Sequence, residues 1–477
     1  MLYSKNKDTC YTRRWLQYTA TVSASLAIFV GGMHLVWASA SLPKLYADDS
    51  PIPITQDQGS WIASLELLAG IPGAPLGAYF ADKFGRKNTL FLTAIPYIIS
   101  WILIACATDV WPLYIAKILV GLGDGSSFTI LPMFIGEIAE DDIRGKLGNC
   151  MTVMLDLGSL FLYCIAPWIT IRQMSYVGMV FPILLVILLC FIYETPYYLL
   201  MKKKSDKARK SLRKYRGTNE IDEEFTEMSN IVEKQMSETS NWLDLYTNKA
   251  YFRAFIIMIG LKTMQMMSGI YAMQVFAELI FEAAEEEADN MMLSSSVQAI
   301  LFGVAQFASG FGAMLIVDKV GRRPLLIISC LGCFCALSMQ TTYFYIQYYN
   351  LADLGSVQLL PVISLMFYIT MYSVGLGAIP LMVPSEMFPT NIKAKAISLT
   401  DIYLALLGFL IVNFYQSVAE NFGSHIPFGI FALSCLLSIF FVIFVMPETK
   451  GKSLEEIQNI LKGEIPLKKI SAVSNIS

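Results

Sequence analysis

The stretch DKFGRK at residues 82–87 separates two long apolar runs, and a near copy, DKVGRR, separates two more at residues 318–323. The second copy begins almost half of the 477-residue chain after the first. Each copy combines a glycine with one acid and three or more polar or basic neighbours, which is typical of a short loop between two membrane-crossing helices. The repetition predicts two similar halves with the same loop at the same place.

The composition places the chain among membrane proteins. Hydrophobic residues make up 55% of it, charged residues only 15%, and the mean hydropathy is +0.54. A soluble protein of this length cannot hide so much apolar surface in its core. The net charge of −3 favours no nucleic-acid partner. With nine cysteines almost all inside apolar runs and only two histidines, we expect no metal site and no cofactor.

Apolar runs of about 20 residues, the length that crosses a bilayer as a helix, occur twelve times. Six precede a polar interval and six follow it. The predicted spans are residues 17–40, 60–80, 89–107, 112–135, 147–170, 175–193, 252–281, 294–317, 324–346, 358–383, 396–418 and 426–446. The expected fold class is therefore an all-α polytopic membrane protein, with twelve transmembrane helices in two six-helix pseudo-symmetric halves.

The polar interval divides the chain into four expected parts. These are an N-terminal six-helix half at 1–194, a cytoplasmic linker with short amphipathic helices at 195–250, a C-terminal six-helix half at 251–446 and a cytoplasmic tail at 447–477. Lysine and arginine gather in alternate loops and near both termini, and such loops stay on the cytoplasmic side. We expect a multi-pass plasma-membrane protein with both termini cytoplasmic. The basic stretch KKKSDKARKSLRK at 202–214 is also suited to contact with anionic lipid.

Charged residues other than the two hexapeptides also recur at matching places in the two halves. We predict a cytoplasmic gating network of ion pairs made of Asp82, Arg86, Lys87, Glu137, Arg144 and Glu194 in the first half, and of Asp318, Arg322, Arg323, Glu386, Lys393 and Glu448 in the second. An exposed ion pair is worth only about 0–1 kcal/mol, so a whole network is needed to bias a conformational equilibrium. For one copy alone, a positively charged anchor with a glycine turn is the simpler interpretation.

Six stretches carry a family resemblance. They are ADKFGRK (81–87), PMFIGEIAEDDIRG (132–145), ETPYYLL (194–200), VDKVGRRPL (317–325), PSEMFP (384–389) and PETKGKSLEEI (447–457). On these residues the chain resembles the sugar-porter family of the major facilitator superfamily, from its first span to about residue 457. Within that family, QGSWIASLELLAG (58–70) is similar to insect transporters of the facilitated trehalose type, a glucose-transporter-like group.

The resemblance implies alternating-access transport of a sugar, commonly by facilitated diffusion, without covalent chemistry, so we expect no enzyme. It also points to sugar-binding residues, of which Gln265 matches the first of the family's paired glutamines. Tyr271 and Gln306 stand where the family has asparagines, and Thr152 replaces a glutamine. The full predicted set is Gln265, Tyr271, Gln306, Thr152, Asp156, Ser159 and Ser373. It holds fewer amide side chains than a typical hexose site, so the sugar, trehalose or a hexose, stays open.

Several ionisable residues lie inside the predicted spans: Glu66, Lys117, Asp124, Asp156, Lys262 and Asp401. Because a charge in a bilayer is costly, such groups should face the protein interior and pair. Two pairings are expected. Lys117, which stands where the family has an arginine, lies on the same helix face as Asp124, and Asp156 is expected to pair with Lys262.

Two other functions remain open. Proton-coupled symport is one, because His34, Glu66 or Asp156 could titrate. Against it, the aspartate that related symporters carry in the first span is Ala38 here. A non-transporting sugar receptor on the same scaffold is the other. The expected partners are a small-molecule sugar and the lipid bilayer, with a monomer as the working unit.

Overall fold

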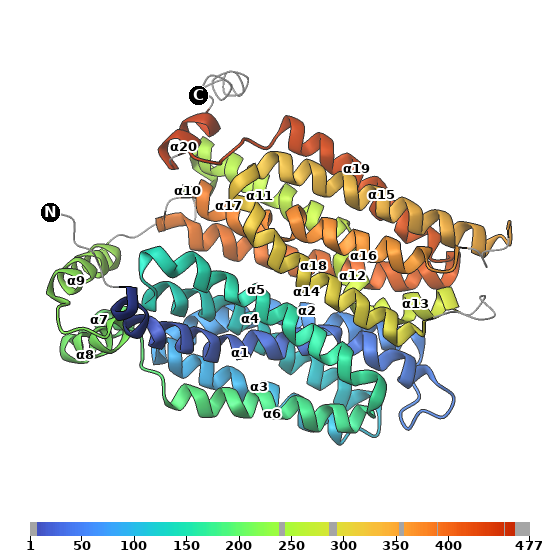
Figure 1. Ribbon diagram of the computed structural model, residues 1–477, viewed down its shortest axis with the longest axis horizontal. Helices are drawn as coiled ribbons and strands as arrows, with labels where there is room; N and C mark the ends of the chain where they lie inside the picture. The colour runs from blue at the N-terminus through green and yellow to red at the C-terminus, as the bar shows by residue number, and fades with distance from the viewer. Residues whose placement is uncertain are drawn as a thin grey trace. The chain divides into compact units, whose positions relative to one another are not determined.

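The helices of the computed structural model account for the predicted spans. The structure describes residues 7–237, 244–285, 293–352, 357–388, 390–452 and 454–462. In chain order the elements are α1 (Lys7–Tyr46), α2 (Gln56–Phe84), α3 (Arg86–Ala105), α4 (Val110–Ile138), α5 (Asp141–Ile165), η1 (Ala166–Trp168), α6 (Ile171–Cys190), α7 (Pro196–Met201), α8 (Ser205–Arg216), α9 (Asp222–Ser237), α10 (Asp244–Thr247), α11 (Lys249–Met267), α12 (Ile270–Val275), α13 (Ala277–Glu285), α14 (Ser295–Val320), α15 (Arg322–Tyr348), α16 (Leu360–Tyr372), η3 (Ser373–Gly377), α17 (Ile379–Met387), α18 (Thr390–Phe422), α19 (His425–Phe444) and α20 (Leu454–Lys462) (Figure 1).

Within the described ranges, twelve helices are long and apolar enough to cross a membrane, which confirms the predicted number. Within the described ranges, two of the predicted spans are broken near their middle. The span predicted at 252–281 is divided into α11, α12 and α13, and the span predicted at 358–383 changes from α16 through the π-helical turn η3 into α17. Apolar periodicity does not reveal such breaks, because the side chains on both sides of each break remain apolar.

The described chain separates into two compact units. One comprises residues 1–37 and 44–239, and the other comprises residues 38–43 and 240–477. In the first unit, α4 packs against α2 and α3, and α3 also packs against α6. In the second unit the equivalent spans repeat this pattern, with α16 against α14 and α15, and α15 against α19. The duplication suggested by the hexapeptides is thus also a duplication of helix packing.

Close approach of α2 and α4 depends on glycine. A Cβ atom added to Gly121 would lie 2.2 Å from the carbonyl oxygen of Glu66, and one added to Gly125 would lie 2.3 Å from that of Gly70. No side chain fits at these distances, so the two backbones meet directly. Small residues allow such packing within a membrane, where apolar side chains gain little from leaving the lipid.

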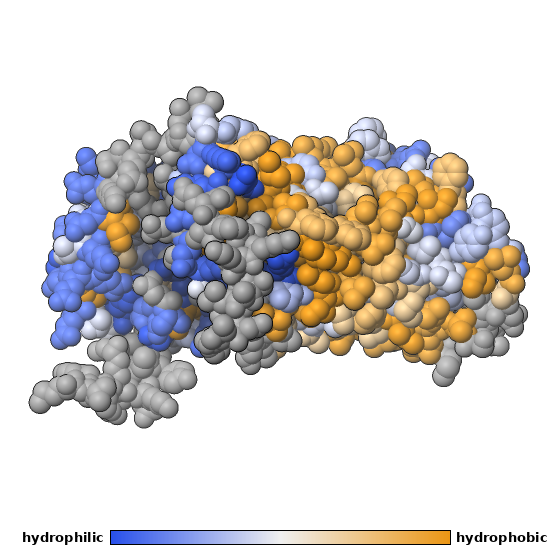
Figure 2. Space-filling model, turned by 90° about the horizontal axis from the view of Figure 1, so that it is seen from above, coloured by the Kyte–Doolittle hydropathy of each residue, from blue (hydrophilic) through white to orange (hydrophobic). Residues whose placement is uncertain are grey.

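The outward surfaces of the spans are apolar. Large aliphatic side chains such as Ile187, Leu331 and Leu437 are 49%, 50% and 58% exposed. Figure 2 shows hydrophobic residues covering the middle of the helices on the face in view, with hydrophilic residues gathered toward one end. Exposure of this extent indicates a lipid-facing surface rather than a water-facing one.

Helices α7, α8 and α9, which follow the sixth span, pack within the first unit. Ala208, Leu212 and Tyr215 of α8 are fully buried, as the predicted amphipathic pattern requires. The Tyr215 hydroxyl donates a hydrogen bond to the carbonyl of Tyr193, 2.6 Å away, just beyond α6. Helix α8 is therefore attached to the end of the sixth span.

Candidate functional site

Arg86, the arginine of the first hexapeptide, is held by a network inside the first unit. Its side chain is only 3% exposed, and its Nε donates to Oε1 of Glu137 on α4 at 2.8 Å. A second guanidinium nitrogen donates to the carbonyl of Ala81 at 3.1 Å. Asp82 lies 3.5 Å from the same group, but its side chain is 63% exposed. Glu137, whose side chain is only 11% exposed, therefore contributes more to holding Arg86 than Asp82 does.

Glu194 stabilises the start of α3 in the same network. Its Oε1 accepts the backbone N–H groups of Arg86 and Lys87 at 3.1 and 3.2 Å. The residue before α3 is Gly85, which has a φ of +100° and no side chain to cap the helix. The carboxylate of Glu194 thus serves as the cap and lies at the positive end of the helix dipole. Burial raises the pKa of Glu194 above its usual value.

The second unit repeats this arrangement. Nη2 of Arg322 lies 2.8 Å from Oε1 of Glu386. Glu448 accepts the backbone N–H groups of Arg322 and Arg323 at 3.1 and 3.0 Å. The residue before α15 is Gly321, with a φ of +106°. Two threonines complete the match: Thr195 donates to Glu137 in the first unit, and Thr449 donates to Glu386 in the second.

The structure places several of the predicted gate residues in these two networks. Glu137 and Glu386 bind the hexapeptide arginines of their own units. The side chain of Arg144 is exposed and that of Lys393 is partly buried. The side chain of Asp318 lies outside the part of the chain that the structure describes.

Thr195 and Thr449 were not predicted as members of the networks. The signal was present, because each follows a glutamate at the end of its half, in ETP and in PET. Lys87 and Arg323 do belong to the networks, but through their backbone N–H groups rather than their charges. A role that a residue plays through its backbone N–H group cannot be recognised from its type of side chain.

A second cluster of charges is buried among the spans of the first unit. Nζ of Lys117 lies 2.7 Å from Oε2 of Glu66 and donates to the carbonyl of His34, also at 2.7 Å. The predicted pairing of Lys117 with Asp124 is therefore wrong. Asp124 instead accepts the hydroxyl of Tyr97 at 2.6 Å. The α2–α4 contact decides the partner of Lys117, since it brings Glu66 to its ammonium group.

Beside this cluster lies His34 of α1, whose carbonyl accepts the Lys117 ammonium. The His34 ring stacks on Trp101 at a centroid distance of 4.0 Å, and neither of its ring nitrogens has a hydrogen-bond partner in the described ranges. A titratable group is therefore buried next to the Lys117–Glu66 ion pair.

A polar group in the second unit contains the predicted residue Gln265. Its Nε2 donates to the Tyr372 hydroxyl at 3.2 Å, and its Oε1 has no partner among the residues that the structure describes. Nearby, the Tyr368 hydroxyl donates to the carbonyl of Ser268 at 3.0 Å. α11 ends at this point, because Gly269 has a φ of +85°. Broken helices of this kind expose polar backbone and side-chain groups suited to binding a polar substrate.

Other predicted residues of the second unit lie near helix irregularities. Ser373 begins the π-helical turn η3 and lies 3.2 Å from the hydroxyl of Ser309 on α14. Gln306 of α14 is buried, and Tyr271 of α12 is partly buried. Lys262 lies 3.3 Å from Asp401 of the same unit, a pairing that the sequence analysis did not include. The pairing of Asp156 with Lys262 stays a prediction.

The predicted residues of α5 do not share one open face. Thr152 is exposed, Asp156 is buried, and the Ser159 hydroxyl donates to the carbonyl of Gly32 at 3.0 Å. A Cβ atom on Gly32 would lie 2.1 Å from the carbonyl of Leu155, so α1 and α5 pack closely here. Ser159 therefore takes part in helix packing, a role that its spacing from Thr152 did not reveal.

Two six-helix units with the same packing order and the same arginine–glutamate network define a multi-pass membrane protein of the major facilitator fold. A family model described as "Sugar (and other) transporter" matches residues 3–461. The chain belongs to this family.

Curated relatives agree over nearly the whole chain. Facilitated trehalose transporter Tret1 of Anopheles gambiae is 31% identical over 466 residues, which are 97% of this chain and 58% of the relative. Tret1 of Polypedilum vanderplanki is 30% identical over 465 residues, 95% of this chain and 90% of the relative. The chain thus spans little more than half the length of some of the curated relatives it matches.

Solved structures share the fold. The inward-open xylose transporter XylE of E. coli has a TM-score of 0.77 at 22% identity, over 93% of this chain and 99% of that one. The proton:xylose symporter XylE bound to 6-bromo-6-deoxy-D-glucose has a TM-score of 0.73 at 23% identity, over 94% of this chain and 99% of that one. At these identities the likeness concerns the fold alone.

Proposed function

We propose that the protein is a sugar transporter that works by alternating access and carries trehalose or a hexose by facilitated diffusion. Membership of the sugar transporter family supports this function, as do relatives named as facilitated trehalose transporters. The observation that carries the proposal is the duplicated network, in which Arg86 binds Glu137 and Arg322 binds Glu386. The protein binds and moves its substrate without covalent chemistry.

Each network can act as a latch on its own unit. In the first unit it joins the turn between α2 and α3 to the end of α4 and to the segment after α6. Any movement that separates these helix ends must break several charge-assisted hydrogen bonds, each worth about 1.5–3 kcal/mol. Forming and breaking the latch therefore provides two discrete states of each unit, as alternating access requires.

We assign sugar binding to the predicted residues, with Gln265 as the principal member. Its free Oε1 can accept a sugar hydroxyl, and the neighbouring rings of Tyr368 and Tyr372 offer apolar faces for a sugar ring. Gln306, Tyr271 and Ser373 would add contacts from the same unit. Thr152 and Asp156 would contribute from α5, whereas the packing role of Ser159 makes it a secondary member.

The placement in the cell follows from charge. We propose that both termini and helices α7, α8 and α9 are cytoplasmic, because lysine and arginine gather there. The proposed four-part division is 1–194, 195–250, 251–446 and 447–477. We place the protein in the plasma membrane as a monomer, since each unit carries its own complete latch.

Counterflow in proteoliposomes tests the function. Vesicles that contain the purified protein and unlabelled trehalose or glucose should accumulate the labelled sugar transiently, without any imposed ion gradient. Saturable counterflow of at least one of these sugars is the expected result. Sugar binding without counterflow would favour a receptor on the same scaffold, and neither binding nor counterflow with a panel of sugars and polyols would overturn the proposal.

Proton-coupled symport is the second candidate, favoured by the buried ionisable groups of Glu66, Lys117 and His34. If a proton bound by Glu66 travels with the sugar, uptake into lightly buffered vesicles should acidify their interior in step with the sugar. Replacement of Glu66 by Gln should then abolish acidification. Sugar uptake without any internal pH change would instead support facilitated diffusion.

A further inference from the structure

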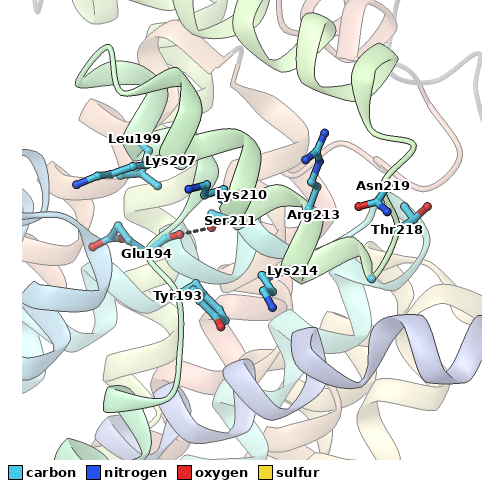
Figure 3. Close-up of a pocket in the computed structure, with 11 residues that line it drawn as sticks. Tyr193, Glu194, Leu199, Lys207, Lys210, Ser211, Arg213, Lys214, Thr218 and Asn219 are labelled. Atoms are coloured by element: carbon cyan, nitrogen blue, oxygen red, sulfur yellow. Dashed lines mark hydrogen bonds between the residues drawn. The ribbon is translucent and has the colours of Figure 1, made fainter.

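A cavity of about 710 Å³ lies in the first unit between the segment after α6 and the helix α8. Figure 3 shows the side chains that line it. Those lining residues are Tyr193, Glu194, Leu199, Lys207, Lys210, Ser211, Arg213, Lys214, Gly217, Thr218 and Asn219. None of them belongs to the predicted sugar site, and the sugar-transport function does not account for this cavity.

The cavity is lined by cations that have no acidic partner. Lys207, Lys210, Arg213 and Lys214 form no ion pair or hydrogen bond within the described ranges. On the same helix, Arg209 and Arg216 are neutralised, since they lie 2.8 and 2.6 Å from Asp222 and Glu224. The arginines of α8 that face α9 are therefore paired with acids, whereas the four cations at the cavity have no acidic partner among the described residues. Uncompensated charges that line one cavity attract an anion.

The single carboxylate of the lining does not neutralise these cations. Oε1 of Glu194 accepts the backbone N–H groups of Arg86, Lys87 and Thr195. In Figure 3 the side chains of Lys207 and Lys210 extend toward the side on which Glu194 lies, Lys214 lies near Tyr193, and Arg213 extends the other way. The three lysines are therefore better placed than Arg213 to bind an anion at the cavity.

The position of the cavity at the end of a membrane span indicates which kind of anion would bind there. The membrane-spanning α6 ends at Cys190, and the ring of Phe191 is 75% exposed directly before the cavity begins at Tyr193. Tyr193 and Leu199 add apolar surface to the lining. A ligand with a phosphate for the lysines and an apolar part for this surface would match both features.

We propose that this cavity binds a phosphate group, and that the phosphate belongs to the headgroup of an anionic phospholipid in the adjoining leaflet. The lysines hold the phosphate, while Tyr193 and Leu199 contact the glycerol region. The Ser211 hydroxyl donates to the backbone carbonyl of Glu194, so the ligand lies beside the residue that caps α3. Leaflet composition would thereby act on the latch of the first unit.

Native mass spectrometry of the full-length protein tests this site. The protein is released from nanodiscs of phosphatidylcholine with a minor fraction of phosphatidylserine or phosphatidylinositol 4-phosphate, and lipid adducts are counted. The test variant is K207Q/K210Q/K214Q, and the matched control is K202Q/K203Q/K204Q. Both remove three exposed lysines from the same basic stretch, but only the first set lines the cavity. Because all six side chains are exposed, both variants should fold, which circular dichroism checks.

The unchanged protein should retain anionic lipid in preference to phosphatidylcholine. The cavity variant should lose at least about tenfold in this preference, since each lysine near a lipid surface contributes measurably, while the control stays within about twofold. Equal losses in both variants, or no preference at all, would overturn the site. Competition with inositol trisphosphate and inorganic phosphate separates the sources. If these bind at the cavity lysines while lipid does not, the phospholipid assignment is wrong.

Discussion

Replacement of Arg86 by Gln is the most direct test of the latch. The arginine makes a charge-assisted hydrogen bond of 2.8 Å to Glu137 and a second bond of 3.1 Å to the carbonyl of Ala81. Loss of the first is worth about 1.5–3 kcal/mol and loss of the second about 0.5–1.5 kcal/mol. The latched state should therefore weaken by about 2–4 kcal/mol, which changes its population ratio by a factor of about 30 to several hundred.

The assay must separate gating from sugar affinity and from folding. Counterflow in proteoliposomes should fall by tenfold or more in R86Q, while equilibrium binding of the sugar in detergent changes by less than about threefold. A thermal unfolding curve shows whether the variant still folds. E137Q, which keeps the shape of the partner, supplies a second route to the same broken contact.

Two further variants, compared with R86Q, test the same interpretation. The Asp82 side chain is 63% exposed and lies 3.5 Å from Arg86, so D82N should cost only about 0–1 kcal/mol and leave most of the counterflow. The double variant R86Q/E137Q should lose less than the sum of the two single losses, because both remove one interaction. If D82N is as harmful as R86Q, if the losses add, or if R86Q loses sugar affinity with normal counterflow, the latch is not the function of this network.

Four further results are expected. R322Q should lower counterflow about as much as R86Q, because the second unit repeats the contact; normal transport would confine the latch to the first unit. K117M should lower the free energy of unfolding by about 3–5 kcal/mol by leaving buried Glu66 unpaired, and thermal denaturation of K117M/E66Q should show recovery of most of it. Additive losses would show that the two are not a pair. G269A should lower the thermal midpoint, because φ is +85° and the new Cβ would lie 2.4 Å from the Phe431 ring; an unchanged midpoint would mean that the bend adjusts. Acidification on the side of the membrane that carries Glu194 should slow transport, since the raised pKa of Glu194 lets it protonate and lose its charge at a higher pH than an exposed glutamate; E194Q should be slow and independent of pH in this range, and matching pH profiles would exclude Glu194.

The partners of the buried charges could not be predicted from the sequence. Lys117 and Asp124 were recognised as membrane-embedded ionisable residues on one helix, but the predicted pairing between them was wrong. Their partners Glu66 and Tyr97 come from α2 and α3, both of which pack against α4. The spacing of residues along one helix predicts which of them share a face. It does not predict which neighbouring helix supplies the counter-charge, because the choice of helix depends on how closely two backbones approach.

The amino-acid sequence alone predicts the twelve spans, the duplication and the two hexapeptide turns, because lipid imposes a fixed length of apolar helix and repeats preserve local pattern. It also indicated Arg86, Glu137 and Glu194 as members of one network. The three-dimensional packing was needed to show that Glu194 caps α3 through the backbone, that Thr195 joins the network, and that Ser159 packs against α1. Backbone hydrogen bonds and helix contacts join residues far apart in the chain, and their partners are set by three-dimensional distance rather than by residue type.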